Sequence, residues 1–213
     1  MRKRILVTAG PTREFFDPVR FISNPSSGRM GFSVAAAAAQ AGHIVDLVHG
    51  PVGLPVPAGV RAHAVVTSEE MLERVRPIFD ECDILFMVAA VCDFRPADYC
   101  VEKVKKEDVP ATARFERTVD ILKTLSARKR AGQVLVGFAA ETRDIEAYAR
   151  RKLVEKDLHY IVANRVGRVG DSGENAFEAE TNRIVLIGRD GVCLEQGPAL
   201  KSELARWLVA QVV

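Results

Sequence analysis

Ile5-Leu-Val-Thr-Ala-Gly-Pro-Thr-Arg13, followed by Ser23-Asn-Pro-Ser-Ser-Gly-Arg-Met-Gly31, decides the fold of this chain. The apolar run that ends at Gly10 is typical of a buried parallel strand that stops at a turn. The serines and glycines of the second stretch come directly before an alanine-rich helix. Such a helix start offers backbone N–H groups to an anion. The first crossover is therefore predicted to hold a phosphate group, with Gly10, Ser26, Ser27 and Gly28 as its binding residues.

The spacing of these glycines does not match the dinucleotide-binding fingerprint. G-x-G-x-x-G places its glycines in one tight turn between a strand and a helix. Here a long polar and aromatic insert separates Gly10 from Gly28. The insert is where we expect the specific chemistry.

Composition indicates one domain over residues 1–213 and a small anionic ligand. The 213 residues are 48% hydrophobic and 27% charged, without a low-complexity linker or an internal repeat. The net charge of +2 is not typical of a nucleic-acid-binding protein. Local basic clusters still suit a phosphorylated small molecule.

The sequence contains no pattern typical of a signal peptide, a membrane span or a zinc site. Met1-Arg-Lys-Arg4 leads directly into the first strand, and no window reaches the roughly 18 apolar residues of a membrane span, so we expect a cytoplasmic protein without a membrane partner. The four cysteines form no C-x-x-C pair and the four histidines lack metal-ligand spacing. Reduced thiols and no zinc are expected.

Apolar patterns alternate between strand and helix along the chain. Strands are predicted at 5–9, 44–48, 62–66, 84–89, 134–138, 160–163 and 184–187, and helices near 31–41, 68–80, 118–130, 144–156 and 199–211. This order predicts an α/β fold with a doubly wound, mostly parallel sheet and a Rossmann-like three-layer architecture. Residues 182–194 predict a C-terminal antiparallel hairpin, a candidate dimer edge. Ligands bind such sheets at the carboxyl ends of the strands, so the loops after Ala9, Ala89, Phe138 and Ala163 are the candidate site.

Two of these loops carry polar residues with more than one interpretation. The Asn24 amide could donate a hydrogen bond to an oxyanion or a ligand carbonyl, or it could simply form a turn. Ser26 and Ser27 could cap the helix and bind phosphate at once. Asp93 could position a polar group or a metal-bound phosphate, or cap a turn. Cys92 beside it lacks a nearby histidine and is expected to be a small residue in a tight place.

Basic residues follow in two further segments. Residues 102–108 alternate in charge and are either solvated surface or a mobile cationic flap that would act on a phosphate through Lys103, Lys105 and Lys106. Lys152 and Lys156 are four apart, so they share one helix face and could straddle a triphosphate. Tyr148 and Lys152 also match the Y-x-x-x-K spacing of short-chain dehydrogenases. That interpretation lacks the glycine fingerprint, and Leu135 stands where the partner serine would be.

Taken together, these motifs resemble the phosphopantothenoylcysteine synthetase family, and the resemblance covers essentially the whole chain in order. The matching segments are Ala9-Gly-Pro-Thr-Arg13, Asp17-Pro-Val-Arg20, Ile22-Ser-Asn-Pro-Ser-Ser-Gly-Arg-Met-Gly31, Ala89-Ala-Val-Cys-Asp93, Glu102-Lys-Val-Lys-Lys106, Val136-Gly-Phe-Ala-Ala-Glu-Thr142 and the pair Lys152 and Lys156.

The resemblance implies a ligase of coenzyme A biosynthesis. In this family CTP activates 4′-phosphopantothenate to an acyl-cytidylate with loss of pyrophosphate, and L-cysteine then forms the amide. The resemblance also implies Mg²⁺, held mainly by the triphosphate, and a homodimer. Asn24 would polarise the acyl-nucleotidylate carbonyl and Lys103 would act in nucleotidyl transfer. The implied nucleotide contacts are Ala89, Asp93, Lys103, Val119, Asp120, Ile121, Leu122, Phe138, Lys152 and Lys156.

Several points stay open at the level of sequence. Relatives are commonly fused behind a flavin-dependent decarboxylase domain, so the chain is either a stand-alone enzyme or an excised domain. Cys92 stands where alanine or serine is expected, and the segment after Lys106 is shorter than in some relatives. CTP and ATP remain alternatives. An NAD(P)-dependent short-chain oxidoreductase and a non-catalytic nucleotide-binding module are the other functions considered.

Overall fold

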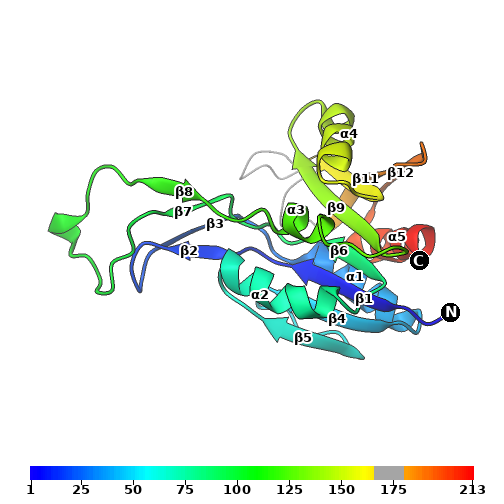
Figure 1. Cartoon of the computed structure of the whole chain (residues 1–213), viewed down its shortest axis with the longest axis horizontal. Helices are drawn as coiled ribbons and strands as arrows, with labels where there is room; N and C mark the ends of the chain where they lie inside the picture. The colour runs from blue at the N-terminus through cyan, green and yellow to red at the C-terminus, as the bar shows by residue number, and fades with distance from the viewer. Residues whose placement is uncertain (166–179) are drawn as a thin grey trace.

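A computed structural model describes residues 1–165 and 180–213 of the chain (Figure 1). Its centre is an eight-stranded sheet in the order β12-β11-β10-β9-β6-β1-β4-β5. The strands of this sheet are β1 (Arg4–Ala9), β4 (Ile44–His49), β5 (Val60–Ala64), β6 (Ile84–Met87), β9 (Val134–Glu141), β10 (Tyr160–Arg165), β11 (Thr181–Gly188) and β12 (Cys193–Leu200). Six neighbouring strands of the sheet run parallel to one another: β10, β9, β6, β1, β4 and β5. Strand β11 runs antiparallel to β10, and β12 runs antiparallel to β11.

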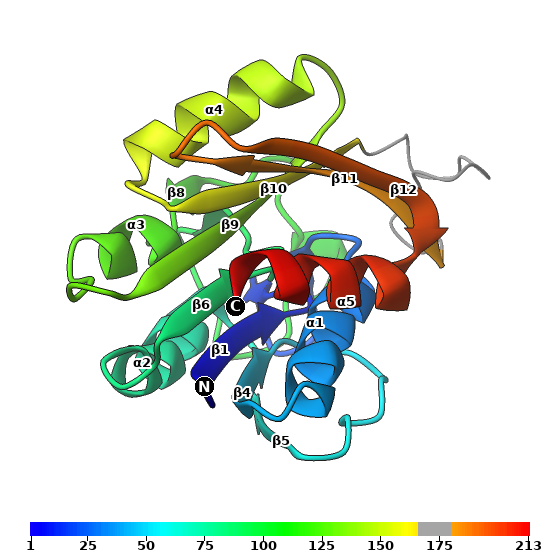
Figure 2. The same ribbon diagram turned by 90° about the vertical axis from the view of Figure 1, so that its right-hand side faces the viewer.

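Helices cover both faces of the sheet, as Figure 2 shows. One layer contains α1 (Arg29–Gln40) and α5 (Lys201–Val212). The other contains α2 (Ser68–Phe79), α3 (Ile121–Ser126) and α4 (Ile145–Glu155). Strand residues alternate between the layers: Leu6 packs in the α2–α4 core, whereas Ile5 and Val7 pack in the α1–α5 core. None of these helices in the described part of the chain has the length and apolar character to cross a membrane.

The predicted doubly wound sheet with a C-terminal hairpin is therefore confirmed. Most predicted element boundaries differ from the observed ones by one to three residues, and two elements show why. The strand expected at 62–66 is β5, which begins two residues earlier. The helix expected at 118–130 is shorter and consists of α3 alone. It begins after Asp120, whose carboxylate caps the helix by accepting from Lys123 N at 3.0 Å. It ends at Ser126, and the chain then turns toward Gly132, whose φ is +82°.

Two short ribbons project from the sheet to one side (Figure 1). One pairs β2 (Arg13–Phe15) with β3 (Phe21–Ser23), and the other pairs β7 (Phe94–Pro96) with β8 (Phe115–Arg117). We call these two ribbons and their connecting loops, residues 13–23 and 94–117, the arm. The 3₁₀-helix η1 (Lys106–Asp108) lies in the longer loop. Three-residue strands carry too little periodicity to be predicted, and none of the four was.

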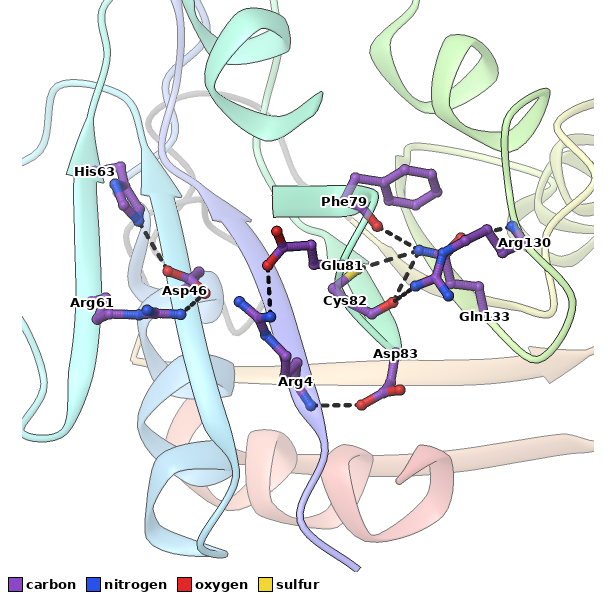
Figure 3. Close-up of polar contacts among 10 residues, drawn as sticks. All are labelled: Arg4, Asp46, Arg61, His63, Phe79, Glu81, Cys82, Asp83, Arg130 and Gln133. Atoms are coloured by element: carbon purple, nitrogen blue, oxygen red, sulfur yellow. Dashed lines mark hydrogen bonds and ion pairs between the residues drawn. The ribbon is translucent and has the colours of Figure 1, made fainter. Parts of the chain in front are cut away.

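Polar contacts fasten the opposite edge of the sheet, where the parallel strands begin (Figure 3). Gln133, just before β9, donates from Nε2 to the carbonyl oxygens of Phe79 and Cys82 at 2.6 and 3.0 Å. The Arg4 N–H donates to Asp83 at 2.8 Å. These contacts tie the turn after α2 to β1 and β9.

Gly31 sets how closely α1 approaches β1. A Cβ atom at Gly31 would lie 2.5 Å from Ala9 Cβ and 2.9 Å from the Thr8 carbonyl oxygen. We therefore expect Gly31→Ala to reduce the free energy of unfolding by about 1–3 kcal/mol in urea titrations, since helix and strand must separate. Gly53→Ala is the matched control, because its Cβ would meet nothing within 4 Å. Equal losses in the two variants would contradict the close approach.

Candidate functional site

A cavity of about 570 Å³ opens at the carboxyl edge of the sheet. The ends of β1, β6, β9 and β10 contribute to it, together with the start of α1, α3 and α5 and one face of α4. The described residues that line it are Gly10, Asn24, Ser26, Ser27, Gly28, Arg29, Met30, Gly31, Met87, Val88, Ala89, Ala90, Val91, Asp93, Arg117, Thr118, Val119, Asp120, Ile121, Leu122, Phe138, Ala140, Lys152, Lys156, Asn164, Asn182, Ile184 and Lys201. The cavity thus lies at the edge where the sequence predicted a ligand.

The glycines that are distant in sequence meet at the base of this cavity. A Cβ atom at Gly28 would lie 3.4 Å from the Cα atom of Gly10. Both glycines have positive φ, +73° and +75°, and Gly28 is the N-cap of α1. The predicted cap was therefore one or two residues early: Ser26 lies before the cap, and its hydroxyl accepts from Gly28 N at 3.3 Å. Gly10 and Gly28 thus supply the turn, and Gly31 the close packing of helix on strand, for which the compact fingerprint also uses glycines.

Asn24 lies against the loop that follows β6. Its Nδ2 atom donates to the carbonyl oxygens of Ala90 and Val91 at 3.1 and 3.0 Å. The two N–H groups of the amide are thus directed to the backbone in this conformation. A role in polarising a ligand carbonyl requires at least one of these bonds to be exchanged for the ligand.

The same loop is held from beneath by Thr8, which is fully buried in β1. Its Oγ1 atom accepts from the N–H groups of Val88 and Ala89, both at 3.1 Å, and donates to the Met87 sulfur at 3.3 Å. A single hydroxyl therefore satisfies two backbone donors where β6 ends. The loop is fixed while its outer surface remains available to the cavity.

Lys152 and Lys156 line the cavity from α4, as their spacing predicted, and each is paired with a carboxylate. Lys152 Nζ lies 2.7 Å from Glu141 Oε1, and Lys156 Nζ lies 2.9 Å from Asp120 Oδ2. Burial alone would raise the pKa of Asp120, but hydrogen bonds from Lys123 N and Lys156 outweigh it and lower that pKa. Asp120 is therefore ionised at neutral pH and orients Lys156.

Lys103 is the one predicted site residue that does not line this cavity. It is exposed in the arm, next to Val104, whose N–H donates to Asp17 at 3.3 Å and whose carbonyl accepts from Arg20 at 3.1 Å. Burial alone would raise the pKa of Asp17, but hydrogen bonds from Val19 N, Arg20 N, Val104 N and the Arg20 guanidinium lower it. The loop next to Lys103 is thus anchored to a buried, ionised carboxylate.

Sequence reasoning missed several cavity residues. Asn164 ends the predicted strand after Ala163, so its loop was searched but the residue was not singled out. Asn182 and Lys201 come from the hairpin and from the start of α5. No local pattern marks them, because only the long-range pairing of β10 with β11 brings them to the cavity.

The cavity lining carries more positive than negative charge. Five cationic side chains, Arg29, Arg117, Lys152, Lys156 and Lys201, face two carboxylates, Asp93 and Asp120, among the described residues. Within residues 1–165 and 180–213, no three His, Cys, Asp or Glu side chains gather as a metal site. The arrangement favours a polyanionic ligand over a cation bound by the protein alone.

Two other candidates have structural roles. Cys92 is buried, its sulfur lies 3.5 Å from the Thr12 carbonyl oxygen, and burial raises the pKa of its thiol. It is a small packed residue, as expected. Tyr148 does not line the cavity, and its ring lies under the Arg151 guanidinium at 5.1 Å. The Y-x-x-x-K spacing therefore does not form a dehydrogenase site with Lys152.

Comparison with known proteins places this fold and cavity in a family. The model of the DNA/pantothenate metabolism flavoprotein C-terminal domain matches residues 1–213. The chain belongs to this family. It is 47% identical over 190 residues to the coenzyme A biosynthesis bifunctional protein CoaBC of Bacillus subtilis, which covers 89% of this chain and 46% of that protein. The chain thus spans about half the length of the curated relatives it matches.

Solved structures of the family agree with the fold. The crystal structure of the C-terminal domain of a bifunctional protein CoaBC superposes with a TM-score of 0.82 at 41% identity, covering 98% of this chain and 93% of the other. A Cab2 mutant in complex with phosphopantothenate-cysteine has a TM-score of 0.78 at 14% identity, covering 98% of this chain and 86% of the other. The second likeness is one of fold.

We expect the Thr8 hydroxyl to be needed for the shape of the cavity loop. Thr8→Val removes the acceptor of two backbone N–H groups and should lower the free energy of unfolding by about 1–3 kcal/mol in denaturant titrations. Thr8→Ser keeps the hydroxyl and is the matched control, with a smaller loss from the missing methyl group. A Thr8→Val variant as stable as Thr8→Ser would contradict the hydroxyl's role.

Proposed function

We propose that this chain is a phosphopantothenate–cysteine ligase of coenzyme A biosynthesis, acting as one domain over residues 1–213. The main support is that the site residues implied by the resemblance, except Lys103, all line one cavity. The chain that forms this cavity belongs to the matching family. The relatives named for coenzyme A biosynthesis support the same pathway. We propose a cytoplasmic location and no nucleic-acid or membrane partner.

The proposed reaction has two steps. A carboxylate oxygen of 4′-phosphopantothenate attacks the α-phosphorus of CTP, and the bond to the β-phosphate breaks so that pyrophosphate leaves with the electron pair. The amine of L-cysteine then attacks the acyl carbonyl, and CMP leaves as the amide forms. The amine nitrogen releases one proton as the amide forms. Negative charge develops on pyrophosphate in the first step and on the acyl oxygen and CMP in the second, so the positive lining lowers both barriers by electrostatic stabilisation. No protein nucleophile is needed.

Nucleotide and acyl groups are assigned to different walls of the cavity. Phe138, Asp120 and the lysines of α4 would hold the nucleotide, with Val119, Ile121 and Leu122 beside it. Gly10, Ser26, Ser27 and Gly28 would hold a phosphate with the backbone N–H groups of α1. Asn24 would exchange a bond to Ala90 or Val91 for the acyl-cytidylate carbonyl.

Mg²⁺ is proposed to enter with CTP. Asp93 and Asp120 are the carboxylates of the described lining, and Asp120 already accepts from Lys123 N and Lys156. Two separate carboxylates do not form a cage for the ion, whereas triphosphate oxygens are the ligands that Mg²⁺ commonly keeps. The ion would neutralise phosphate charge during attack.

We further propose that the active form is a homodimer. Lys103 lies off the cavity of its own chain, and the arm that carries it exposes large apolar side chains, among them Phe21, Phe94, Tyr99 and Phe115. Exposed apolar surface of this kind marks an interface. A second copy that covers the arm would bring Lys103 to its neighbour's cavity.

The first experiment is a pyrophosphate-release assay with CTP, phosphopantothenate and Mg²⁺, followed by detection of phosphopantothenoylcysteine after L-cysteine is added. A ligase releases pyrophosphate only when all three components are present. Parallel reactions with ATP establish the nucleotide. CTP binding without turnover would indicate a nucleotide-binding module instead, and NAD(P)H binding would indicate an oxidoreductase.

Two variants should separate the two steps. Asn24→Ala should still release pyrophosphate but accumulate the acyl-cytidylate, detected by mass spectrometry of quenched reactions. Lys103→Gln should instead lose pyrophosphate formation by about two to three orders of magnitude, because one charge partner of the transition state is removed. Arg114→Gln, which removes an exposed cation from the same arm, is the matched control. Normal amide formation by Asn24→Ala, or normal pyrophosphate release by Lys103→Gln, would refute the corresponding role.

A further inference from the structure

The cations of the cavity come from both helix layers. Lys152 lies in α4 and Lys156 is the C-cap of that helix, which packs on the sheet face shared with α2 and α3. Arg29 and Lys201 are the first residues of α1 and α5, which pack on the opposite face (Figure 2). The cavity at the carboxyl edge of the sheet therefore has one cationic pair on each side, Lys152 with Lys156 and Arg29 with Lys201. The resemblance accounts for the first pair but assigns nothing to the second.

Lys201 is unusual because it is a lysine with only 8% of its surface exposed that still lines the cavity. Its backbone N–H donates to the Glu180 carbonyl at 2.9 Å, which fixes the start of α5. Burial, and then the charge of Arg29, lower the pKa of the Lys201 ammonium. Arg29 contacts the carboxylate of the same Glu180 whose carbonyl accepts from Lys201 N, so two cationic residues lie around one residue at this end of the cavity. An anionic ligand in the cavity would be attracted by both.

Within residues 1–165 and 180–213, Arg29 makes one ion pair. Its guanidinium lies 3.8 Å from the Glu180 carboxylate, a long contact between two well-exposed side chains. Such pairs contribute little and separate readily. Arg29 is therefore available to a ligand in the cavity, next to the backbone N–H groups at the start of α1.

We propose that Lys201 and Arg29 form a second phosphate subsite, on the α1–α5 side of the cavity. Its identity rests on the proposed function: with the base and ribose of the nucleotide on the α4 side, the β- and γ-phosphates reach this subsite. Lys201 and Arg29 then stabilise the charge that pyrophosphate gains as the α–β phosphate bond breaks. Phosphopantothenate carries the same chemical group, so the experiment compares both sources.

Titration calorimetry without turnover tests the subsite directly. The ligands are inorganic pyrophosphate, CTP and CMP, and separately phosphopantothenate and pantothenate. Lys201→Gln and Arg29→Gln should each weaken pyrophosphate and CTP binding about 10- to 100-fold while CMP binding changes less than twofold. Arg206→Gln removes a cation from an exposed position of the same helix α5 and is the matched control, expected to bind as the parent chain does.

The two sources of phosphate give different results. Selective loss of pyrophosphate and CTP affinity supports the nucleotide assignment. Selective loss of phosphopantothenate affinity, with pantothenate unchanged, supports the subsite but assigns it to the acyl substrate. Unchanged affinity for all of these ligands in both variants overturns the subsite.

Two controls separate this inference from folding and from the ligase proposal. Lys201→Arg keeps the charge and should restore pyrophosphate affinity to within a few-fold, and exposed Arg29 tests the subsite even when Lys201→Gln does not fold. Pyrophosphate binding is measured without catalysis, so a chain that is inactive as a ligase still tests the subsite. If the chain is an active ligase and neither substitution changes its affinity for pyrophosphate or phosphopantothenate, the subsite is contradicted and the ligase proposal is not.

Discussion

The contact between the end of β1 and the start of α1 is the constraint on which the cavity depends. Gly10 and Gly28 both adopt positive φ and meet backbone to backbone, and Gly31 lets the helix lie directly on Ala9. A Cβ atom at Gly31 would push helix and strand apart, and the positive φ of Gly10 and Gly28 disfavours any side chain there. The start of α1 consequently lines the cavity, where its backbone N–H groups suit a phosphate group.

Charge is organised around this base rather than concentrated at one point. Asp120 orients Lys156 and Glu141 orients Lys152, so the cations of α4 are paired before any ligand arrives. On the other face Arg29 and Lys201 line the same cavity from the starts of α1 and α5. A ligand that carries several negative charges gains from both groups, because pre-oriented charges need little reorganisation during reaction.

Local patterns predicted the fold and most of the cavity because they act over short distances. The apolar strand before Gly10, the helix after Gly28 and the i, i+4 lysines of α4 are each encoded within one segment. Lys201 was not predictable, since a lysine at the start of a helix is usually solvated and only β-sheet order brings it to the cavity. The arm was missed because three-residue strands have no periodicity. That Lys103 does not line the cavity of its own chain was not predictable either, because it depends on how the arm folds in three dimensions.

The insert between Gly10 and Gly28 begins and ends at the same place in the fold. Its two ends are already in contact, so a change in its length alters the closure entropy by only about 0.6 kcal/mol per doubling. The glycine contact at the base of the cavity is therefore thermodynamically almost indifferent to the length of the insert. The insert can lengthen or shorten at its far end while α1 keeps its place on β1, so the arm can change during evolution without rebuilding the base of the cavity.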